Sequence, residues 1–97
     1  MTTLTPAQIT QSLTTLPGWQ LGNHASELGQ LEREFSFKDF VAAMRFVNKV
    51  AGLAEEAGHH PDIDIRYNKV RLALSTHDAG GITEKDTALA TAISNLR

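Results

Sequence analysis

The sequence predicts an α+β fold in two layers, with three helices packed on one face of a four-stranded, mainly antiparallel sheet. Two observations support this prediction: three segments begin with the residues typical of helix N-termini, and the stretches between them alternate apolar and polar residues. The expected order is helix, strand, strand, helix, strand, strand, helix. Helices that cover one face of such a sheet bury the apolar side of both layers.

Three capping signatures mark the helices. In residues 5–8 (TPAQ), Thr5 stands at the N-cap, with a proline at the first helical position and a glutamine at the third, so a helix is expected up to about Thr14. Residues 36–39 (SFKD) repeat the arrangement and predict a helix over about residues 37–57. Residues 83–86 (TEKD) predict the third helix.

The second helix carries a broad apolar surface. Its apolar residues cover about half of the circumference, whereas packing on one sheet needs an arc of about 100° or slightly more. The excess predicts a second apolar partner, either the other two helices or another copy of the chain. The stripe consists of Phe40, Met44, Val47, Ala51 and Ala54, and it is widened by Phe46, Val50 and Leu53.

Alternation with a period of two predicts four strands, over about residues 19–23, 28–35, 62–67 and 70–75. Asn68-Lys69 is expected to be the turn of a hairpin between the last two strands, because asparagine tolerates positive φ. This turn would pair Tyr67 with Val70 and place the apolar residues of both strands on one face. Further along the same ladder, His60 would lie opposite His77.

Composition excludes several classes of protein. The 97 residues are expected to form a single domain over 1–97, and the absence of cysteine excludes disulfides, thiolate metal sites and a cysteine nucleophile. The net charge of −2 and the scattered nine Lys and Arg argue against a nucleic-acid partner. No signal-peptide pattern and no apolar run of about 18–20 residues occurs, so we expect a soluble cytoplasmic protein without a membrane partner.

Three of the four histidines are expected to meet at one end of the sheet. His59 and His60 follow Gly58, which fits the end of the second helix. His77 leads into a glycine-containing turn over residues 78–81. Loops at the ends of rigid elements commonly hold functional residues, so this cluster is the candidate site.

Each candidate also has a purely structural interpretation. A histidine near a helix C-terminus is favoured by the helix dipole alone. Asp86 stands where the capping partner of Thr83 is expected, and Glu55 fits a solvated helix face. His24, in a polar turn region, fits a surface histidine.

Three functions compete for the cluster of His59, His60 and His77. A metal site would use one of the two adjacent histidines with His77 and a carboxylate, but the helical spacing of a His-Glu-x-x-His motif is absent. General acid–base catalysis on a small molecule fits imidazole, which titrates near neutral pH. A binding module without chemistry would instead use the sheet face or the second helix.

Six motifs follow one another in a specific order and spacing: FSFKDF (35–40), AE (54–55), HHPD (59–62), YNKV (67–70), LSTH (74–77), and GIT (81–83) followed by Asp86. Together they resemble the pterin-4a-carbinolamine dehydratase family, over nearly the whole chain from about Leu16 onward. The resemblance implies a reaction, the loss of water from 4a-hydroxytetrahydropterin to give quinonoid dihydropterin. This reaction recycles the pterin cofactor of aromatic amino acid hydroxylases.

The resemblance also implies roles for individual residues. His59 and His77 would act as acid and base at the carbinolamine hydroxyl, and His60 would mainly bind the substrate. Asp86 would lie close to His77, orient its imidazole and favour its charged form. No metal and no organic cofactor are implied, because the elimination needs only an acid near the leaving oxygen and a base for the N5 proton.

Contacts with the pterin are implied for four further residues, Glu55 at the pocket edge, Pro61, Ile63 and Thr76. Ile63 stands where many family members carry an aromatic residue. An aliphatic side chain keeps an apolar wall but loses ring stacking, so it would change the affinity for the pterin more than the chemistry.

The resemblance finally implies partners and a rival function. Family members assemble as dimers or tetramers through helix packing, which fits the broad apolar surface of residues 37–57 and makes Phe46, Val50 and Leu53 the interface candidates. An aromatic amino acid hydroxylase of the same pathway is a further expected partner. Some relatives serve as dimerisation cofactors of a transcription factor or in Rubisco assembly, so a non-catalytic interaction role is the alternative.

Overall fold

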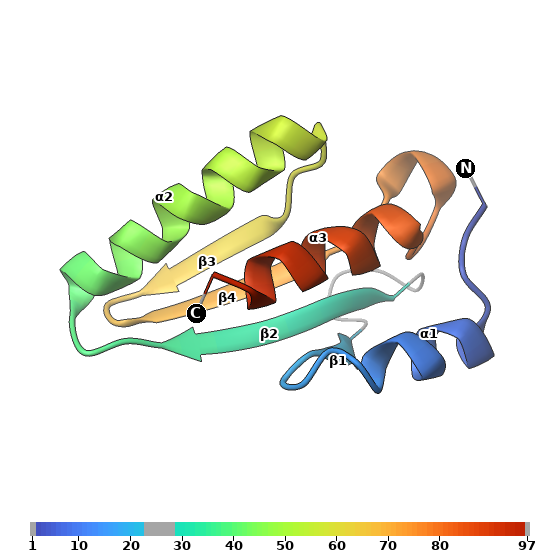
Figure 1. Ribbon diagram of the computed structural model, residues 1–97, viewed down its shortest axis with the longest axis horizontal. Coiled ribbons are helices and arrows are strands. Elements are labelled where there is room, and N and C mark those ends of the chain that lie inside the picture. Colours follow the sequence, from blue (N-terminus) through green and yellow to red (C-terminus); the bar gives the residue numbers. More distant parts are fainter. Residues whose placement is uncertain (1, 23–28, 97) are drawn as a thin grey trace.

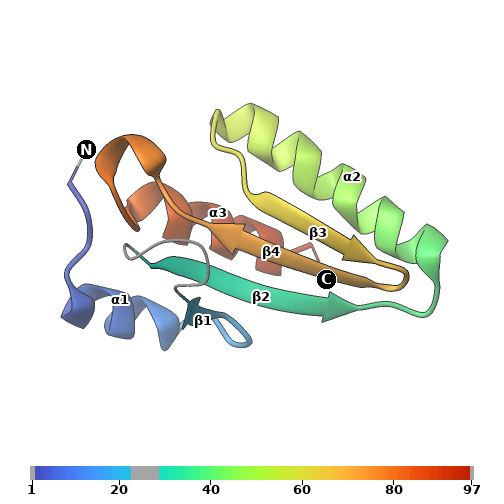
Figure 2. The same ribbon diagram turned by 180° about the vertical axis from the view of Figure 1, so that it is seen from behind.

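The chain folds into a four-stranded antiparallel sheet with strands in the order β1-β2-β4-β3 (Figures 1 and 2). The computed structural model describes residues 2–22 and 29–96. The strands are β1 (Gln20–Gly22), β2 (Gln30–Ser36), β3 (Asp62–Arg66) and β4 (Lys69–Leu74), and the helices are α1 (Pro6–Leu13), α2 (Phe40–Ala57) and α3 (Glu84–Ser94). The predicted α+β class and the predicted order of elements are confirmed.

One apolar core lies between the sheet and helices α2 and α3. Phe35 of β2 and Leu72 of β4 are buried there together with Val50 of α2 and Ile93 of α3. Each such side chain contributes about 1.5–3 kcal/mol through its removal from water. Figure 1 shows α3 in front of the strands and Figure 2 shows it behind them, so this helix lies across one face of the sheet.

Two of the three capping predictions are confirmed. Thr5 and Thr83 cap α1 and α3 through complete capping boxes with Gln8 and Asp86. The prediction for the second helix is wrong, because α2 begins three residues later, with Asp39 as its N-cap.

The reason for this later start is strand pairing. Ser36 stays in β2, where it pairs with Lys69 of β4. The next residue, Phe37, is held by Asn68, whose carbonyl accepts from its N–H at 2.9 Å and whose side-chain amide donates to its carbonyl at 2.8 Å.

The same contacts of Asn68 explain the register of the hairpin. The turn consists of Tyr67 and Asn68, and Ile65 pairs with Val70, so the predicted register is wrong by two residues. A shift of two keeps every side chain on its predicted face, which is why the apolar residues of both strands still share one side. Regular pairing ends where Asp62 meets Ala73, and therefore the ladder itself does not place His60 opposite His77.

The interface prediction for α2 is wrong for Phe46 and Val50, whereas Leu53, which is partly buried, stays a prediction. Phe46 and Val50 are 5% and 0% exposed and belong to the core of the protomer, and Leu53 packs against that core. The apolar surface of α2 is wider than the part that the protomer covers, but the uncovered part is not the part that carries Phe46 and Val50. Phe40 and Val41 remain 47% and 56% exposed.

Within residues 2–22 and 29–96, no helix combines the length and the apolar character needed to cross a membrane. The predictions for His24, for Asn23 at the end of the first strand and for Leu28 at the start of the second concern positions outside the described part of the chain.

Candidate functional site

Three chain segments meet at one end of the sheet and bring the predicted histidines together. α2 ends at Gly58, whose left-handed conformation (φ 63°) turns the chain toward His59. After β4, a bridge between Thr76 and Gly81 closes the loop that carries His77. The start of α3 follows directly. The three imidazoles therefore come from two loops, each anchored to a rigid element, as the sequence predicts.

All three histidines line one pocket of about 260 Å³. His60 and His77 are exposed, whereas the His59 side chain is only 11% exposed. A more open groove of about 700 Å³ between α1 and α3 has no histidine among its lining residues, so it offers no comparable chemistry. The described residues that line the smaller pocket are Gly58, His59, His60, Ser75, Thr76, His77, Asp78 and Lys85.

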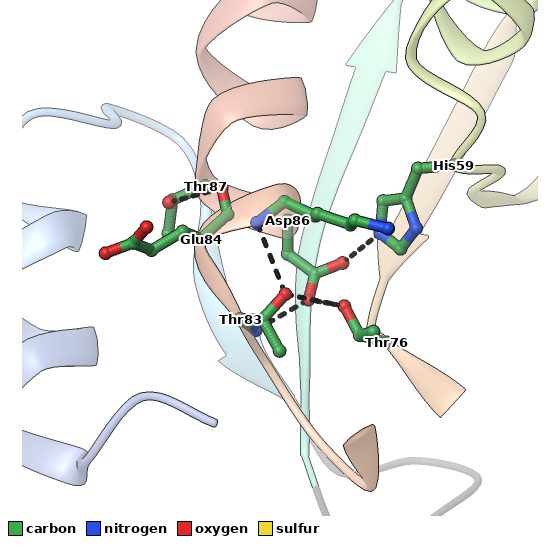
Figure 3. Close-up of polar contacts among 7 residues, drawn as sticks. His59, Thr76, Thr83, Glu84, Asp86 and Thr87 are labelled. Atoms are coloured by element: carbon green, nitrogen blue, oxygen red, sulfur yellow. Dashed lines mark hydrogen bonds and ion pairs between the residues drawn. The ribbon is translucent and has the colours of Figure 1, made fainter. Parts of the chain in front are cut away.

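Asp86 lies behind this pocket, fully buried, and contacts three groups (Figure 3). Its Oδ1 lies 2.5 Å from His59 Nε2. Its Oδ2 accepts from the Thr76 hydroxyl and from the Thr83 N–H, both at 2.8 Å. One carboxylate thus joins the N-terminus of α3 to a histidine and a threonine of the pocket wall.

The predicted partner of Asp86 is therefore wrong. Asp86 holds His59, whereas His77 lies on the exposed 3₁₀ turn over His77–Ala79. Thr76 stays beside Asp86 through its hydrogen bond to Oδ2, whereas His77 begins the 3₁₀ turn that follows it. The oxygens of Asp86 consequently face His59, Thr76 and Thr83.

Glu55 and His60 form a second, exposed pair. The carboxylate of Glu55, on the last turn of α2, contacts Nε2 of His60. Their side chains are 77% and 62% exposed, and a pair in that much water contributes little to stability. The carboxylate of Glu55 can nevertheless orient the imidazole of His60 at the pocket rim.

Not every predicted site residue lines the pocket. Pro61 and Ile63 lie along the start of β3, outside the lining residues, and Ile63 is 38% exposed on the edge strand. Conversely, the sequence interpretation assigned no site role to Thr83 or Lys85. The capping pattern of residues 83–86 was the available signal, since it places both at the start of the helix that carries Asp86.

Among residues 2–22 and 29–96, no group of three or more histidine or carboxylate side chains is arranged to hold a metal ion. The arrangement offers instead two kinds of imidazole, one buried against a carboxylate and two in contact with water. Such groups can donate and accept protons at neutral pH.

A family model described as pterin 4 alpha carbinolamine dehydratase matches residues 2–96. A protein of Acidobacterium capsulatum that carries the provisional name pterin-4-alpha-carbinolamine dehydratase is 59% identical over 96 residues, which cover 99% of each chain. A protein of Chloroflexus aggregans with the same provisional name is 55% identical, with 99% of this chain and 98% of that one covered.

Two solved structures share the fold. The transcriptional coactivator/pterin dehydratase of Brucella melitensis superposes with a TM-score of 0.90 at 34% identity, covering 97% of both chains. A pterin dehydratase-like protein identified as a RuBisCO assembly factor in the alpha-carboxysome superposes with a TM-score of 0.68 at 24% identity, covering 81% of this chain and 88% of that one. At this identity the second likeness concerns the fold alone.

Proposed function

The chain belongs to the pterin 4 alpha carbinolamine dehydratase family, and from this premise we propose that it is a lyase that removes water from 4a-hydroxytetrahydropterin. The product is quinonoid dihydropterin, and the reaction recycles the pterin cofactor of an aromatic amino acid hydroxylase in the cytoplasm. The single domain over residues 1–97 would act without a metal or an organic cofactor. The observation that carries the proposal is the pocket with three imidazoles, one of which contacts a buried carboxylate.

The proposed reaction needs two proton transfers. The bond between C4a and the hydroxyl oxygen breaks, this oxygen takes up a proton and leaves as water, and N5 loses its proton as the C4a–N5 double bond forms. His59 and His77 lie on different loops of the same pocket, so they can address both positions of one substrate. We assign the two proton transfers to this pair.

The remaining predicted site residues would bind the pterin. His60, oriented by Glu55, stands at the rim. Thr76 belongs to the pocket wall. Pro61 and Ile63 would contact only the part of a substrate that extends past His60 along β3. An isoleucine at that place would give an apolar contact without aromatic stacking.

The direct test of this function is turnover. The decay of 4a-hydroxytetrahydropterin, generated in situ, is followed by its ultraviolet absorbance with and without the protein. We expect the protein to accelerate the decay and the product to be quinonoid dihydropterin. A folded protein that leaves the rate unchanged would contradict the proposal.

His60→Ala tests the division of roles within the pocket. Because His60 is exposed and its partner Glu55 is exposed as well, we expect the variant to fold and to raise KM more than it lowers kcat. Steady-state kinetics measure both constants. A fall in kcat at constant KM would assign His60 to the chemistry instead.

The alternative function is a non-catalytic interaction, and one observation favours it. Phe40 and Val41 leave an exposed apolar surface at the start of α2. The Brucella neighbour is described as a coactivator as well as a dehydratase. The turnover assay separates the two functions, since an interaction protein has no need to accelerate the reaction.

The same exposed surface is the place where we propose that copies of the chain associate as a dimer or tetramer. Phe40→Glu would put a charge into such an interface, so we expect a lower mass in sedimentation or light scattering with an intact circular dichroism spectrum. Lys49→Glu, at an exposed position of the same helix, is the control and should leave the mass unchanged. If Phe40→Glu also keeps the mass, α2 is not the interface.

A further inference from the structure

Donor and acceptor accounting fixes the direction of every hydrogen bond around Asp86. A carboxylate accepts only, so the Thr76 hydroxyl must donate its single proton to Oδ2. The oxygens of Thr76 and Thr83 lie 2.8 Å apart, and since the proton of Thr76 is used, the Thr83 hydroxyl is the donor of that bond. The Thr83 oxygen in turn accepts from the N–H of Lys85 at 3.2 Å.

The chain of donors therefore runs in one direction, from the backbone of α3 through Thr83 and Thr76 to the carboxylate. Asp86 and Thr83 are 0% exposed and Thr76 is 8% exposed, so water does not compete for these bonds. In a buried site, hydrogen bonds of this kind hold each group in one orientation. The carboxylate can neither rotate nor release its Oδ2 contacts without leaving a buried donor unpaired.

On its other side the same carboxylate determines the tautomer of His59. Because Oδ1 accepts only, Nε2 of His59 must carry a proton in that contact. In a neutral imidazole the other ring nitrogen, Nδ1, then has the free lone pair. Figure 3 shows Nε2 directed at Asp86 and the opposite side of the ring turned away from it.

We propose that Thr76 is a positioning residue that acts on His59 through Asp86, so that His59 exchanges its proton with the substrate at Nδ1. This inference rests on the proposed dehydratase function for its kinetic part only. When Nδ1 takes up a proton the ring becomes an imidazolium, and when it gives that proton back the ring is neutral again. The other proton stays on Nε2 of His59 and is donated to Asp86 in both states, and the negative carboxylate compensates the charge of the imidazolium.

The proposal changes what is expected of Thr76. Its hydroxyl donates its single proton to Asp86 and accepts from Thr83, so it cannot donate a hydrogen bond to the pterin. A substrate-binding threonine would affect KM. A positioning threonine affects kcat, because it fixes the ring that moves the proton.

Thr76→Val removes the hydroxyl and keeps the shape of the side chain. We expect kcat to fall about tenfold, as is typical for the loss of a hydrogen bond to a charged group, with KM unchanged. Thr76→Ser should restore kcat. Thr87→Val is the matched control, because its hydroxyl bonds the Glu84 carbonyl of the same helix. Wild-type kcat in Thr76→Val, or a change confined to KM, would overturn the proposal.

A spectroscopic measurement tests the proposal without reference to activity. Long-range proton–nitrogen correlation spectra of protein labelled with ¹⁵N-histidine, recorded above neutral pH, distinguish the two imidazole tautomers. We expect His59 in the Nε2–H form in the wild type and a population of the Nδ1–H form in Thr76→Val. A wild-type spectrum with His59 in the Nδ1–H form would overturn the inference. If the protein instead shows the expected tautomer but no turnover, the proposed function fails and the positioning of His59 stands.

Discussion

His59→Gln is expected to lower kcat by about 10²–10⁴-fold while the protein stays folded. The glutamine amide can reach Asp86 and donate a hydrogen bond in place of Nε2, so the buried carboxylate keeps a partner. An amide cannot exchange a proton at neutral pH, and the loss therefore isolates the chemical role of the imidazole. Steady-state kinetics measure the effect, and thermal unfolding checks that the fold is kept.

His77→Ala supplies the comparison for this variant. His77 is exposed on the 3₁₀ turn, so its removal should leave the stability unchanged and still lower kcat strongly. If both variants turn over at the wild-type rate, neither imidazole takes part in the reaction and our assignment of the proton transfers is wrong.

Asp86→Ala is expected to lower the free energy of unfolding by about 3 kcal/mol. It removes the capping partner of α3 and leaves the buried Thr76 hydroxyl and the Thr83 N–H without their acceptor. For a domain of this size, that loss lowers Tm by more than about ten degrees. Chemical and thermal denaturation measure it.

Asp86→Asn separates the structural from the catalytic role of this residue. The amide oxygen can still accept from Thr76 and Thr83, so most of the stability should return. The amide nitrogen, however, would donate to His59 Nε2 and force the proton of the ring onto Nδ1. We therefore expect a stable protein whose kcat is reduced by about 10²–10⁴-fold. A stable Asp86→Asn protein with wild-type kcat would show that Asp86 only caps the helix.

Local patterns predicted the elements wherever no long-range pairing competed with them. The capping boxes of residues 5–8 and 83–86 stand at helix starts, as predicted. Residues 36–39 show the same pattern, but Ser36 pairs with Lys69 of β4, a strand distant in the sequence. A pattern of four residues carries no information about that strand. The predicted position of the hairpin turn is wrong for a similar reason, since the side-chain amide of Asn68 donates a hydrogen bond to the Phe37 carbonyl.

The helical period of α2 predicts how wide its apolar surface is, but not which part of that surface is buried in the protomer. An arc of half the circumference is wider than the sheet can cover, and periodicity alone does not say which part is covered. The buried side of α2 consists of Ala43, Phe46, Val50 and Ala54, and the exposed apolar residues begin at Phe40. A charge at Val50 would consequently test the core of the protomer rather than an interface.

The sequence predicts which histidines lie together at the site, but not the hydrogen bonds that connect the site residues. His59, His60 and His77 could be grouped because each follows the end of a rigid element, and the pocket contains all three. Which of them Asp86 holds depends on contacts between segments distant in the sequence, and there Asp86 contacts His59 rather than His77. Thr83 was recognised only as a cap, because the same four-residue pattern also occurs where it has no further role.

The measurement that tests the account most directly is the initial rate of 4a-hydroxytetrahydropterin loss in the presence of the wild type and of the His59→Gln, His77→Ala double variant. The account predicts a rate well above the uncatalysed one for the wild type and a rate close to the uncatalysed one for the folded double variant. Equal rates for the two proteins, whether fast or slow, would contradict the claim that these imidazoles dehydrate the pterin.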